Sequence, residues 1–295
     1  MRQRASPVER AVRERLRLVR RWLIRARLDA RDTITGRRDP LIPPRRKNLP
    51  SQVSAVGERL AAEARQSGAL EPDGAVLDIG CGPGRLAAPL TRYLDPSAGR
   101  YEGFDVMPRS IRWCRSRITR RHPNFRFQLA DLHNAEYNPG GRQRADSYVF
   151  PYADAGFDLA VAASLFTHLR PFESERYLHE AARTLRPGGR LLASWYVYDD
   201  EARELVGAGR ARRPGLFAER LAPLALEPME DERGNAFWTL DPLVPERMIV
   251  VGEEDLRALH AAAGLRILEI RRGFWPGRER GPESYDQDMV LAERP

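Results

Sequence analysis

The sequence contains little cysteine and no long apolar run. Only Cys81 and Cys114 occur among its 295 residues, too few for a disulfide scaffold or for a zinc site built on cysteine ligands. No window approaches the roughly 18 consecutive apolar residues of a transmembrane helix, and the first residues lack the apolar segment of a secretory signal peptide. We therefore expect a protein without disulfides or membrane-spanning segments, located in the reducing cytoplasm.

Lysine is almost absent, and the positive charge is confined to one end of the chain. Lys47 is the only lysine, against 48 arginines, and the formal net charge is +8. The first 47 residues carry a net charge of +11, so the other 248 residues carry −3. Because a nearly neutral body has no electrostatic attraction for a polyanion, we expect no nucleic-acid partner.

The basic segment predicts an amphipathic helix over residues 8–30. Its apolar residues recur at helical spacing, and most of the others are arginine. Pro40 and the Pro-Pro-Arg-Arg run at 43–46 then predict an extended linker. We expect residues 1–47 to form a basic amphipathic arm and residues 48–295 to form the main domain. The arm would fit an anionic membrane surface, a second copy of the chain in a homodimer, or the body of its own chain.

Predicted strands and helices alternate beyond residue 50. This alternation predicts an α/β fold with a doubly wound parallel sheet of seven strands. We expect strands at 75–79, 100–105, 125–130, 157–163, 190–197, 265–272 and 286–292, and helices at 51–66, 85–94, 108–121, 171–185 and 254–263. Residues 133–156 and 200–250 interrupt the pattern. Because long insertions on such scaffolds are often functional, we expect both to be lids over an acceptor site.

Three closely spaced glycines follow the first predicted strand. Gly80, Gly82 and Gly84 let the backbone approach a ligand between the end of a strand and the start of a helix. A dinucleotide-binding loop would place its third glycine three residues after the second, whereas the interval here is two. Asp78 precedes the loop, where its charge would repel a pyrophosphate and attract an ammonium group.

Residues 76–86 resemble the first motif of class I S-adenosylmethionine-dependent methyltransferases, in particular bacterial enzymes of types 11, 12 and 25 with unassigned acceptors. Later segments match that family in order: Asp105 and Asp131 end the second and third strands, Ser164-Leu165-Phe166 ends the fourth, and 185–192 matches the turn into the fifth. The resemblance implies a seven-stranded Rossmann-like fold and S-adenosylmethionine as cofactor. It implies these cofactor-binding residues: Asp78, Gly80, Cys81, Gly82, Gly84, Arg85, Asp105, Val106, Asp131, Leu132, Ser164 and Phe166.

The resemblance also implies distinct roles for the two later acids. The acid that ends the second strand, Asp105 here, accepts hydrogen bonds from both ribose hydroxyls, because a carboxylate offers two acceptor oxygens to a vicinal diol. The acid that ends the third strand, Asp131 here, faces the adenine amino group. Ser164 and Phe166 would lie beside the methionine part of the cofactor.

The sequence lacks the motifs of enzymes that methylate nucleic-acid bases. An Asn/Asp-Pro-Pro-aromatic sequence would follow the fourth strand in adenine or cytosine amino methyltransferases, but residues 164–169 read Ser-Leu-Phe-Thr-His-Leu. Neither cysteine is placed as a nucleophile for cytosine carbon methylation. We therefore predict transfer to a hydroxyl of a small molecule or glycan. The alternatives are N-methylation of a small metabolite, RNA methylation, and a non-catalytic protein that binds the cofactor or a partner.

His168 is the candidate general base, because it follows the fourth strand at the carboxyl edge of the sheet. The alternative is a histidine that only packs or caps the next helix. Asp131 and His133 alone do not make a metal site, and we predict none. Polar and aromatic side chains in the insertions and the neighbouring strands suit a polyhydroxylated acceptor; the expected acceptor-binding residues are Asn134, Tyr137, Tyr152, Trp195, Trp238 and Gln287.

Overall fold

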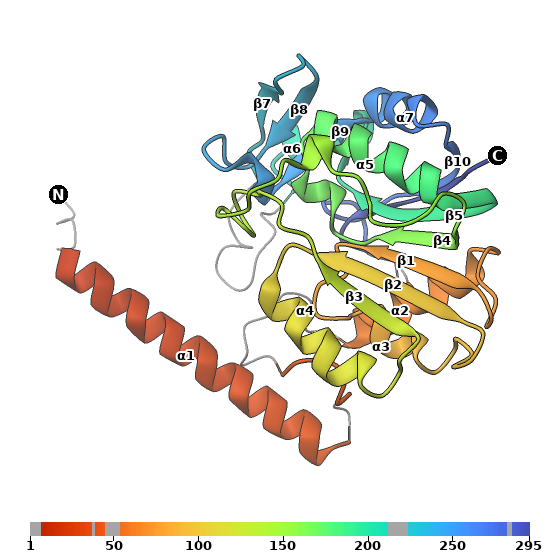
Figure 1. The fold of residues 1–295 in the computed structure, drawn as a ribbon. Helices are drawn as coiled ribbons and strands as arrows, with labels where there is room; N and C mark the ends of the chain where they lie inside the picture. Colours follow the sequence, from red (N-terminus) through yellow and green to blue (C-terminus); the bar gives the residue numbers. More distant parts are fainter. Residues whose placement is uncertain (1–6, 37–38, 45–53, 212–223, 282–284) are drawn as a thin grey trace.

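A seven-stranded sheet forms the centre of the computed structural model, which describes residues 7–36, 39–44, 54–211, 224–281 and 285–295 (Figure 1). The strand order is β10-β11-β5-β4-β1-β2-β3. The strands are β1 (Ala75–Ile79), β2 (Arg100–Asp105), β3 (Phe125–Leu129), β4 (Phe157–Ala162), β5 (Leu185–Trp195), β10 (Arg266–Arg271) and β11 (Asp288–Glu293). The predicted α/β fold with a doubly wound sheet is confirmed.

One strand departs from the parallel arrangement that the alternation predicted. β11 runs antiparallel to both of its neighbours, β10 and β5. The connection from β10 contains no described helix to cross the sheet, and a strand that returns without a crossover must pair antiparallel. The central sheet is therefore mixed.

Helices cover both faces of the sheet because alternate strand residues point to opposite sides. In β1, Val76 joins the apolar cluster beneath α2, α3 and α4, whereas Leu77 joins the cluster beneath α5 and α7 (Figure 1). The helices of the domain are α2 (Ser54–Gln66), α3 (Ala87–Leu90), α4 (Pro108–Cys114), α5 (Pro171–Thr184), α6 (Asp200–Gly207) and α7 (Glu253–Ala262).

Two helices differ from their predicted extent. The helix expected at 85–94 is α-helical only over α3 and continues as turns. Pro89 has no N–H to donate within that segment, which weakens a continuous helix. The helix expected at 108–121 is α4 followed by one π-helical turn over Arg115–Thr119. The π-turn carries Ile118, which is fully buried against the glycine loop.

Most of a second, smaller sheet, which the sequence did not predict, comes from the insertion at 200–250. Its order is β6-β9-β8-β7, with β6 (Val197–Tyr198), β7 (Glu227–Glu230), β8 (Ala236–Thr239) and β9 (Ile249–Gly252). Trp238 in β8 packs on Tyr198 with ring centroids 4.9 Å apart. A short 3-10 helix, Pro245–Arg247, links this sheet to the functional site described below.

The N-terminal helix α1 (Pro7–Ile34) lies beside the body, and its first turns extend away from it (Figure 1). Val19, Trp22 and Leu23 are 56%, 52% and 48% exposed. The segment after α1 packs on the body: Leu41 is buried, and its carbonyl accepts a hydrogen bond from the Trp113 indole at 2.7 Å. Across the ranges that the structure covers, every helix is too short or too polar to cross a membrane.

Candidate functional site

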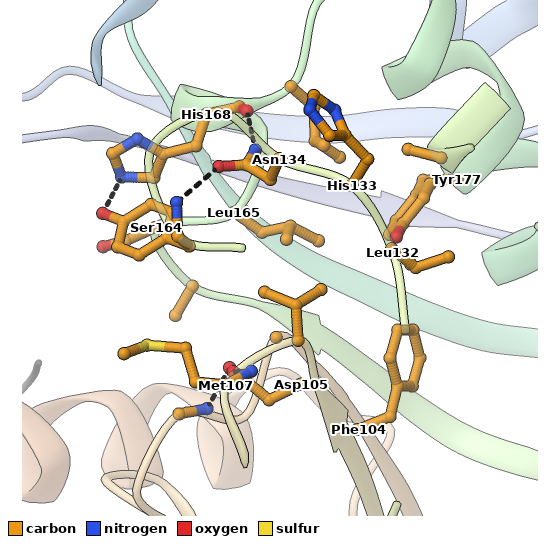
Figure 2. A pocket seen from close by; sticks show the side chains of 17 residues that line it. Phe104, Asp105, Met107, Leu132, His133, Asn134, Ser164, Leu165, His168 and Tyr177 are labelled. Atoms are coloured by element: carbon orange, nitrogen blue, oxygen red, sulfur yellow. Dashed lines mark hydrogen bonds between the residues drawn. The ribbon is translucent and has the colours of Figure 1, made fainter. Parts of the chain in front are cut away.

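A cavity opens where β1 and β4 lie side by side, at the carboxyl ends of the parallel strands (Figure 2). In an open α/β sheet this is where the strand order reverses and where ligands bind. The empty space within it and at its open mouth amounts to about 820 Å³. It is lined by Gly80, Gly82, Phe104, Asp105, Val106, Met107, Leu132, His133, Asn134, Tyr137, Ala145, Ala163, Ser164, Leu165, His168, Leu169 and Tyr177. We call it the nucleoside cavity, after the ligand that the sequence leads us to expect there.

The glycines of the loop after β1 serve different needs. All three have positive φ, at +76° for Gly80, +52° for Gly82 and +86° for Gly84. A Cβ on Gly84 would lie 2.5 Å from Ile118 Cδ1, so this glycine lets the loop pack on the π-turn. A Cβ on Gly82 would meet no atom within 4 Å, because Gly82 faces the open cavity. Gly82 therefore leaves room for a ligand.

Asp105 places a fixed carboxylate in the cavity wall. Its Oδ1 accepts the Met107 N–H at 2.7 Å, and its Oδ2 accepts the Gly82 N–H at 2.8 Å. Both oxygens keep a lone pair for a ligand, since a carboxylate oxygen accepts more than one hydrogen bond. Burial raises the pKa of Asp105 to about 6, so the side chain is mostly ionised at neutral pH.

Asp78 does not line the nucleoside cavity. Its carboxylate is buried on the α2 side of the sheet and accepts a hydrogen bond from the Tyr101 hydroxyl. Burial raises the pKa of Asp78 to about 7. Arg85, the nearest cation, lines a second cavity that adjoins the first.

The two cysteines pack beneath the glycine loop. Cys81 and Cys114 each place a sulfur near the Gly82 carbonyl, at 3.6 and 3.5 Å. Both are buried, and burial raises the pKa of each thiol. They are therefore thiols rather than reactive thiolates.

Ser164 stands at the end of β4 with an unusual backbone. Its φ is +56°, a conformation that costs free energy for a residue with a side chain and that clusters at functional sites. The Ser194 hydroxyl accepts the Ser164 N–H at 2.6 Å, and the Ser164 hydroxyl donates to Gln287 Oε1 at 2.9 Å. These bonds hold the strained turn open toward both cavities.

His168 is held in one tautomer by its two neighbours. Its Nδ1 lies 2.7 Å from the Glu246 carbonyl, which only accepts, so Nδ1 carries the hydrogen. Its Nε2 lies 3.1 Å from the Tyr137 hydroxyl and accepts from it. Asn134 supports the pair by donating to the His168 carbonyl and accepting the Tyr137 N–H (Figure 2). Sequence reasoning selected all three side chains separately, and the fold brings them together.

Burial sets the protonation of this pair. It lowers the pKa of His168 below its ordinary value, so the imidazole is neutral at pH 7. Burial also raises the pKa of Tyr137 to about 12, so the phenol keeps its proton. A neutral imidazole with an accepting nitrogen, next to a neutral phenol, is suited to receive a proton.

Several predicted side chains lie outside the nucleoside cavity. Asp131 pairs with Arg142 at 2.5 Å beside the cavity mouth, although its neighbour Leu132 lines the wall. Phe166 and Trp195 stack in the core at 4.2 Å. Tyr152 packs edge-on against Phe157, and Trp238 belongs to the smaller sheet.

Other lining residues carried no signal in the sequence. Phe104, Met107, Ala145 and Tyr177 complete the cavity wall, and only the folded chain brings these apolar positions together. Val106 lines the wall next to Asp105, and Gln287 lines the second cavity. No group of three or more His, Cys, Asp or Glu side chains is arranged for a metal among the residues described.

Residues 76–189 match a protein family model described as a methyltransferase domain. This range contains the glycine loop, Asp105, Tyr137 and His168. A phthiotriol/phenolphthiotriol dimycocerosates methyltransferase of Mycobacterium tuberculosis is 32% identical over 117 residues, which cover 39% of this chain and 34% of that protein. The O-methyltransferase cnsE of Penicillium expansum is 28% identical over 144 residues, covering 49% and 46%.

The chain spans about a third to a half of the length of the curated relatives it matches. Among solved structures, a Burkholderia thailandensis 1,6-didemethyltoxoflavin-N1-methyltransferase with bound S-adenosylhomocysteine aligns over 100% of this chain and 92% of its own. The identity of that pair is 16% and the TM-score is 0.46.

Proposed function

Because this chain carries a class I S-adenosylmethionine-dependent methyltransferase domain, with S-adenosylmethionine as its cofactor, we propose that it methylates a hydroxyl of a small molecule or glycan. The observation that carries this proposal is the Tyr137 hydroxyl, 3.1 Å from the accepting Nε2 of His168 in the wall of the nucleoside cavity. A hydroxyl acceptor loses a proton during methyl transfer, and this pair offers a route for it.

The nucleoside cavity fits the adenosine part of the cofactor. Asp105 presents two fixed oxygens to the ribose hydroxyls, and Gly82 leaves open space beside them. Val106 and Leu132 supply apolar wall on the side where adenine would lie. Arg85 would take the methionine carboxylate, because it is a half-buried cation with no hydrogen bond to any described residue.

Tyr137 and His168 would move the acceptor proton. When bound, the cofactor supplies a methyl group that is electrophilic because it is attached to a positively charged sulfur. Tyr137 would take the proton of the acceptor hydroxyl while passing its own proton to His168 Nε2. The Glu246 carbonyl, which holds the Nδ1 hydrogen, would then stabilise the resulting imidazolium. Tyr137 would not need to become an anion, which agrees with its raised pKa.

The relatives support an oxygen acceptor through their names. The Penicillium protein is named an O-methyltransferase, and the mycobacterial protein is named for a triol. Both match this chain over less than half of their own length.

The proposal is tested by following a labelled methyl group. The full chain would be incubated with S-adenosylmethionine carrying a ¹³C methyl group and a cell extract, which is then fractionated. We expect label in a small-molecule or glycan fraction, with the carbon resonance of a methyl group on oxygen. A Tyr137→Phe variant should transfer much less label. Label on nitrogen or in RNA would contradict the proposal, and cofactor binding without label in any fraction would indicate a non-catalytic protein.

We further propose that α1 contacts the cytoplasmic face of an anionic membrane. Val19, Trp22 and Leu23 lie within about one turn of each other and are about half exposed. They stand in a segment of net charge +11, attached to a body of opposite sign. Anionic headgroups contribute about 1 kcal/mol for each nearby basic side chain, and the exposed apolar side chains add burial in the interface.

Vesicle flotation of the full chain tests this contact. We expect the protein to float with anionic vesicles, less so at high salt because salt screens the charges. Trp22→Glu should reduce flotation, because it places a negative charge between the exposed apolar side chains of Val19 and Leu23. Leu243→Glu is the matched control, because Leu243 is 91% exposed on the body. Equal flotation of both variants, or a homodimer that Trp22→Glu dissociates, would contradict the membrane contact.

The full chain is required for this test. The domain boundary expected after residue 47 would suggest cutting there, but Leu41 and Ile42 are buried on the body at 7% and 6% exposure. Removing residues 1–47 would therefore expose apolar surface as well as delete the helix.

A further inference from the structure

A second cavity lies on the other side of Ser164 from the nucleoside cavity. Its empty volume is about 820 Å³, and the two cavities share Ala163 and Ser164. Its walls come from α2, from the ends of β4 and β5, and from the segment that leads into β11. We call it the arginine cavity.

Positive charge dominates the arginine cavity. Arg59, Arg85 and Arg280 line it, against the single carboxylate of Asp286 among its described lining residues. Three guanidinium groups around one cavity favour an anionic ligand, because each presents several N–H donors to oxyanions.

Aromatic rings position two of these guanidinium groups. The Arg59 guanidinium carbon lies 4.2 Å from the centre of the Tyr285 ring, and that of Arg280 lies 5.0 Å from the centre of the Phe274 ring. A guanidinium that packs over a ring is restricted in its orientation, and its N–H groups lie at the edge of its plane. The rings therefore restrict Arg59 and Arg280 to fixed positions in the cavity wall.

The cofactor would bring one carboxylate, and Arg85, directly after the glycine loop, is the residue proposed above to bind it. Arg59 and Arg280 add two further cations to the same cavity wall. Building on the function proposed above, we propose that the acceptor carries an oxyanion, a phosphate or a carboxylate, that binds Arg59 and Arg280 in the arginine cavity.

Ser164 connects this oxyanion site with the proton-transfer pair. Gln287 lines the arginine cavity and accepts the Ser164 hydroxyl at 2.9 Å, while Ser164 also lines the nucleoside cavity with Tyr137. An acceptor anchored by its oxyanion would extend past Ser164 and present its hydroxyl at Tyr137. Such anchoring restricts the orientation of the reacting hydroxyl and so speeds transfer.

Binding of inorganic phosphate to the full chain saturated with S-adenosylhomocysteine tests the proposal. Calorimetry would compare the wild type with Arg59→Gln, Arg280→Gln and Arg112→Gln. Arg112 is an exposed residue of α4 outside both cavities and is the matched control. We expect each cavity variant to weaken phosphate binding about tenfold, as for a lost charge-assisted hydrogen bond, and the control to change nothing. Because Arg280 is exposed, its substitution should not affect folding.

Cofactor affinity shows whether Arg59 and Arg280 bind the oxyanion of the acceptor or the carboxylate of the cofactor. We expect all variants to bind S-adenosylhomocysteine as the wild type does. If Arg59→Gln and Arg280→Gln weaken binding of S-adenosylhomocysteine but not of methylthioadenosine, which lacks the carboxylate, the two arginines hold the cofactor and the proposal is wrong. Equal phosphate binding by all four proteins would also overturn it. Neither readout requires methyl transfer, so failure here is separate from failure of the proposed function.

Discussion

Replacing His168 by alanine is expected to lower methyl-transfer turnover by about 10²–10⁴-fold, the usual contribution of general acid–base catalysis. The physical reason is that Nε2 of His168 is the hydrogen-bond acceptor of the Tyr137 hydroxyl, so its loss leaves the acceptor proton without a destination. Turnover would be measured with saturating cofactor and the acceptor identified by methyl labelling. S-adenosylhomocysteine affinity should stay nearly unchanged, because the hydrogen bonds of the His168 side chain run to Tyr137 and Glu246 and not to Asp105 or the glycine loop.

The pH profile separates a proton acceptor from a packing residue. Burial lowers the pKa of His168 below its ordinary value of 6.5, so Nε2 can accept a proton at neutral pH. This capacity is lost as the pH falls through the lowered pKa, because the imidazole is then already protonated. Wild-type turnover should therefore persist at pH 6.5 and decline only in more acidic solution. The residual turnover of His168→Ala should lack this decline, whereas His179→Ala, at an exposed histidine of α5, should retain it. If His168→Ala keeps full activity, or loses cofactor affinity as much as turnover, His168 only packs.

Replacing Asp105 by alanine is expected to weaken S-adenosylmethionine binding by about 1.5–3 kcal/mol, or roughly 10- to 150-fold, as for lost hydrogen bonds to a charged group. The same substitution leaves the N–H groups of Gly82 and Met107 without their acceptor, so the loop beside the ligand loses its support. Calorimetric titration at neutral pH measures the loss.

Asp131→Ala provides the comparison for this titration. Asp131 pairs with Arg142 outside the cavity, so its replacement should cost less affinity than that of Asp105. Affinity should also fall for the wild type as the pH drops below about 6, because protonated Asp105 no longer offers two accepting oxygens. Unchanged affinity in Asp105→Ala would place the ribose elsewhere.

The sequence was sufficient to predict the sheet and the glycine loop, because both depend on local pattern. The β1 run of apolar residues and the glycines that follow define a strand and a tight turn without reference to the rest of the chain. The residue types at 105 and 164 indicated strand ends, and the sheet places both beside the loop. Their position in the cavity follows from the topology that the alternation predicts.

The sequence was insufficient wherever the direction of a side chain depends on distant packing. Phe166 belongs to the segment expected to end the fourth strand beside the cofactor, yet it turns inward to stack on Trp195, a residue of β5. Tyr137 and His168 are 31 positions apart, and their hydrogen bond requires the insertion to fold back over the sheet. The arginine cavity collects side chains from α2 and from the segment before β11, which no local pattern relates.

The smaller sheet was missed for a related reason. Its strands are two to four residues long, too short for a reliable alternation signal. Its core forms through pairing with β9 and through packing of Trp238 on Tyr198, both of which are tertiary contacts. Short strands within an insertion therefore appear in the sequence only as an aromatic-rich interruption.

A crystal structure of the full chain with S-adenosylhomocysteine tests the central claim most directly. We expect the ribose hydroxyls on the Asp105 carboxylate, the methionine part alongside the glycine loop, and the sulfur facing the opening between Ser164 and Tyr137. A complex in which the ribose lies away from Asp105, or in which the sulfur points away from Tyr137, would contradict it.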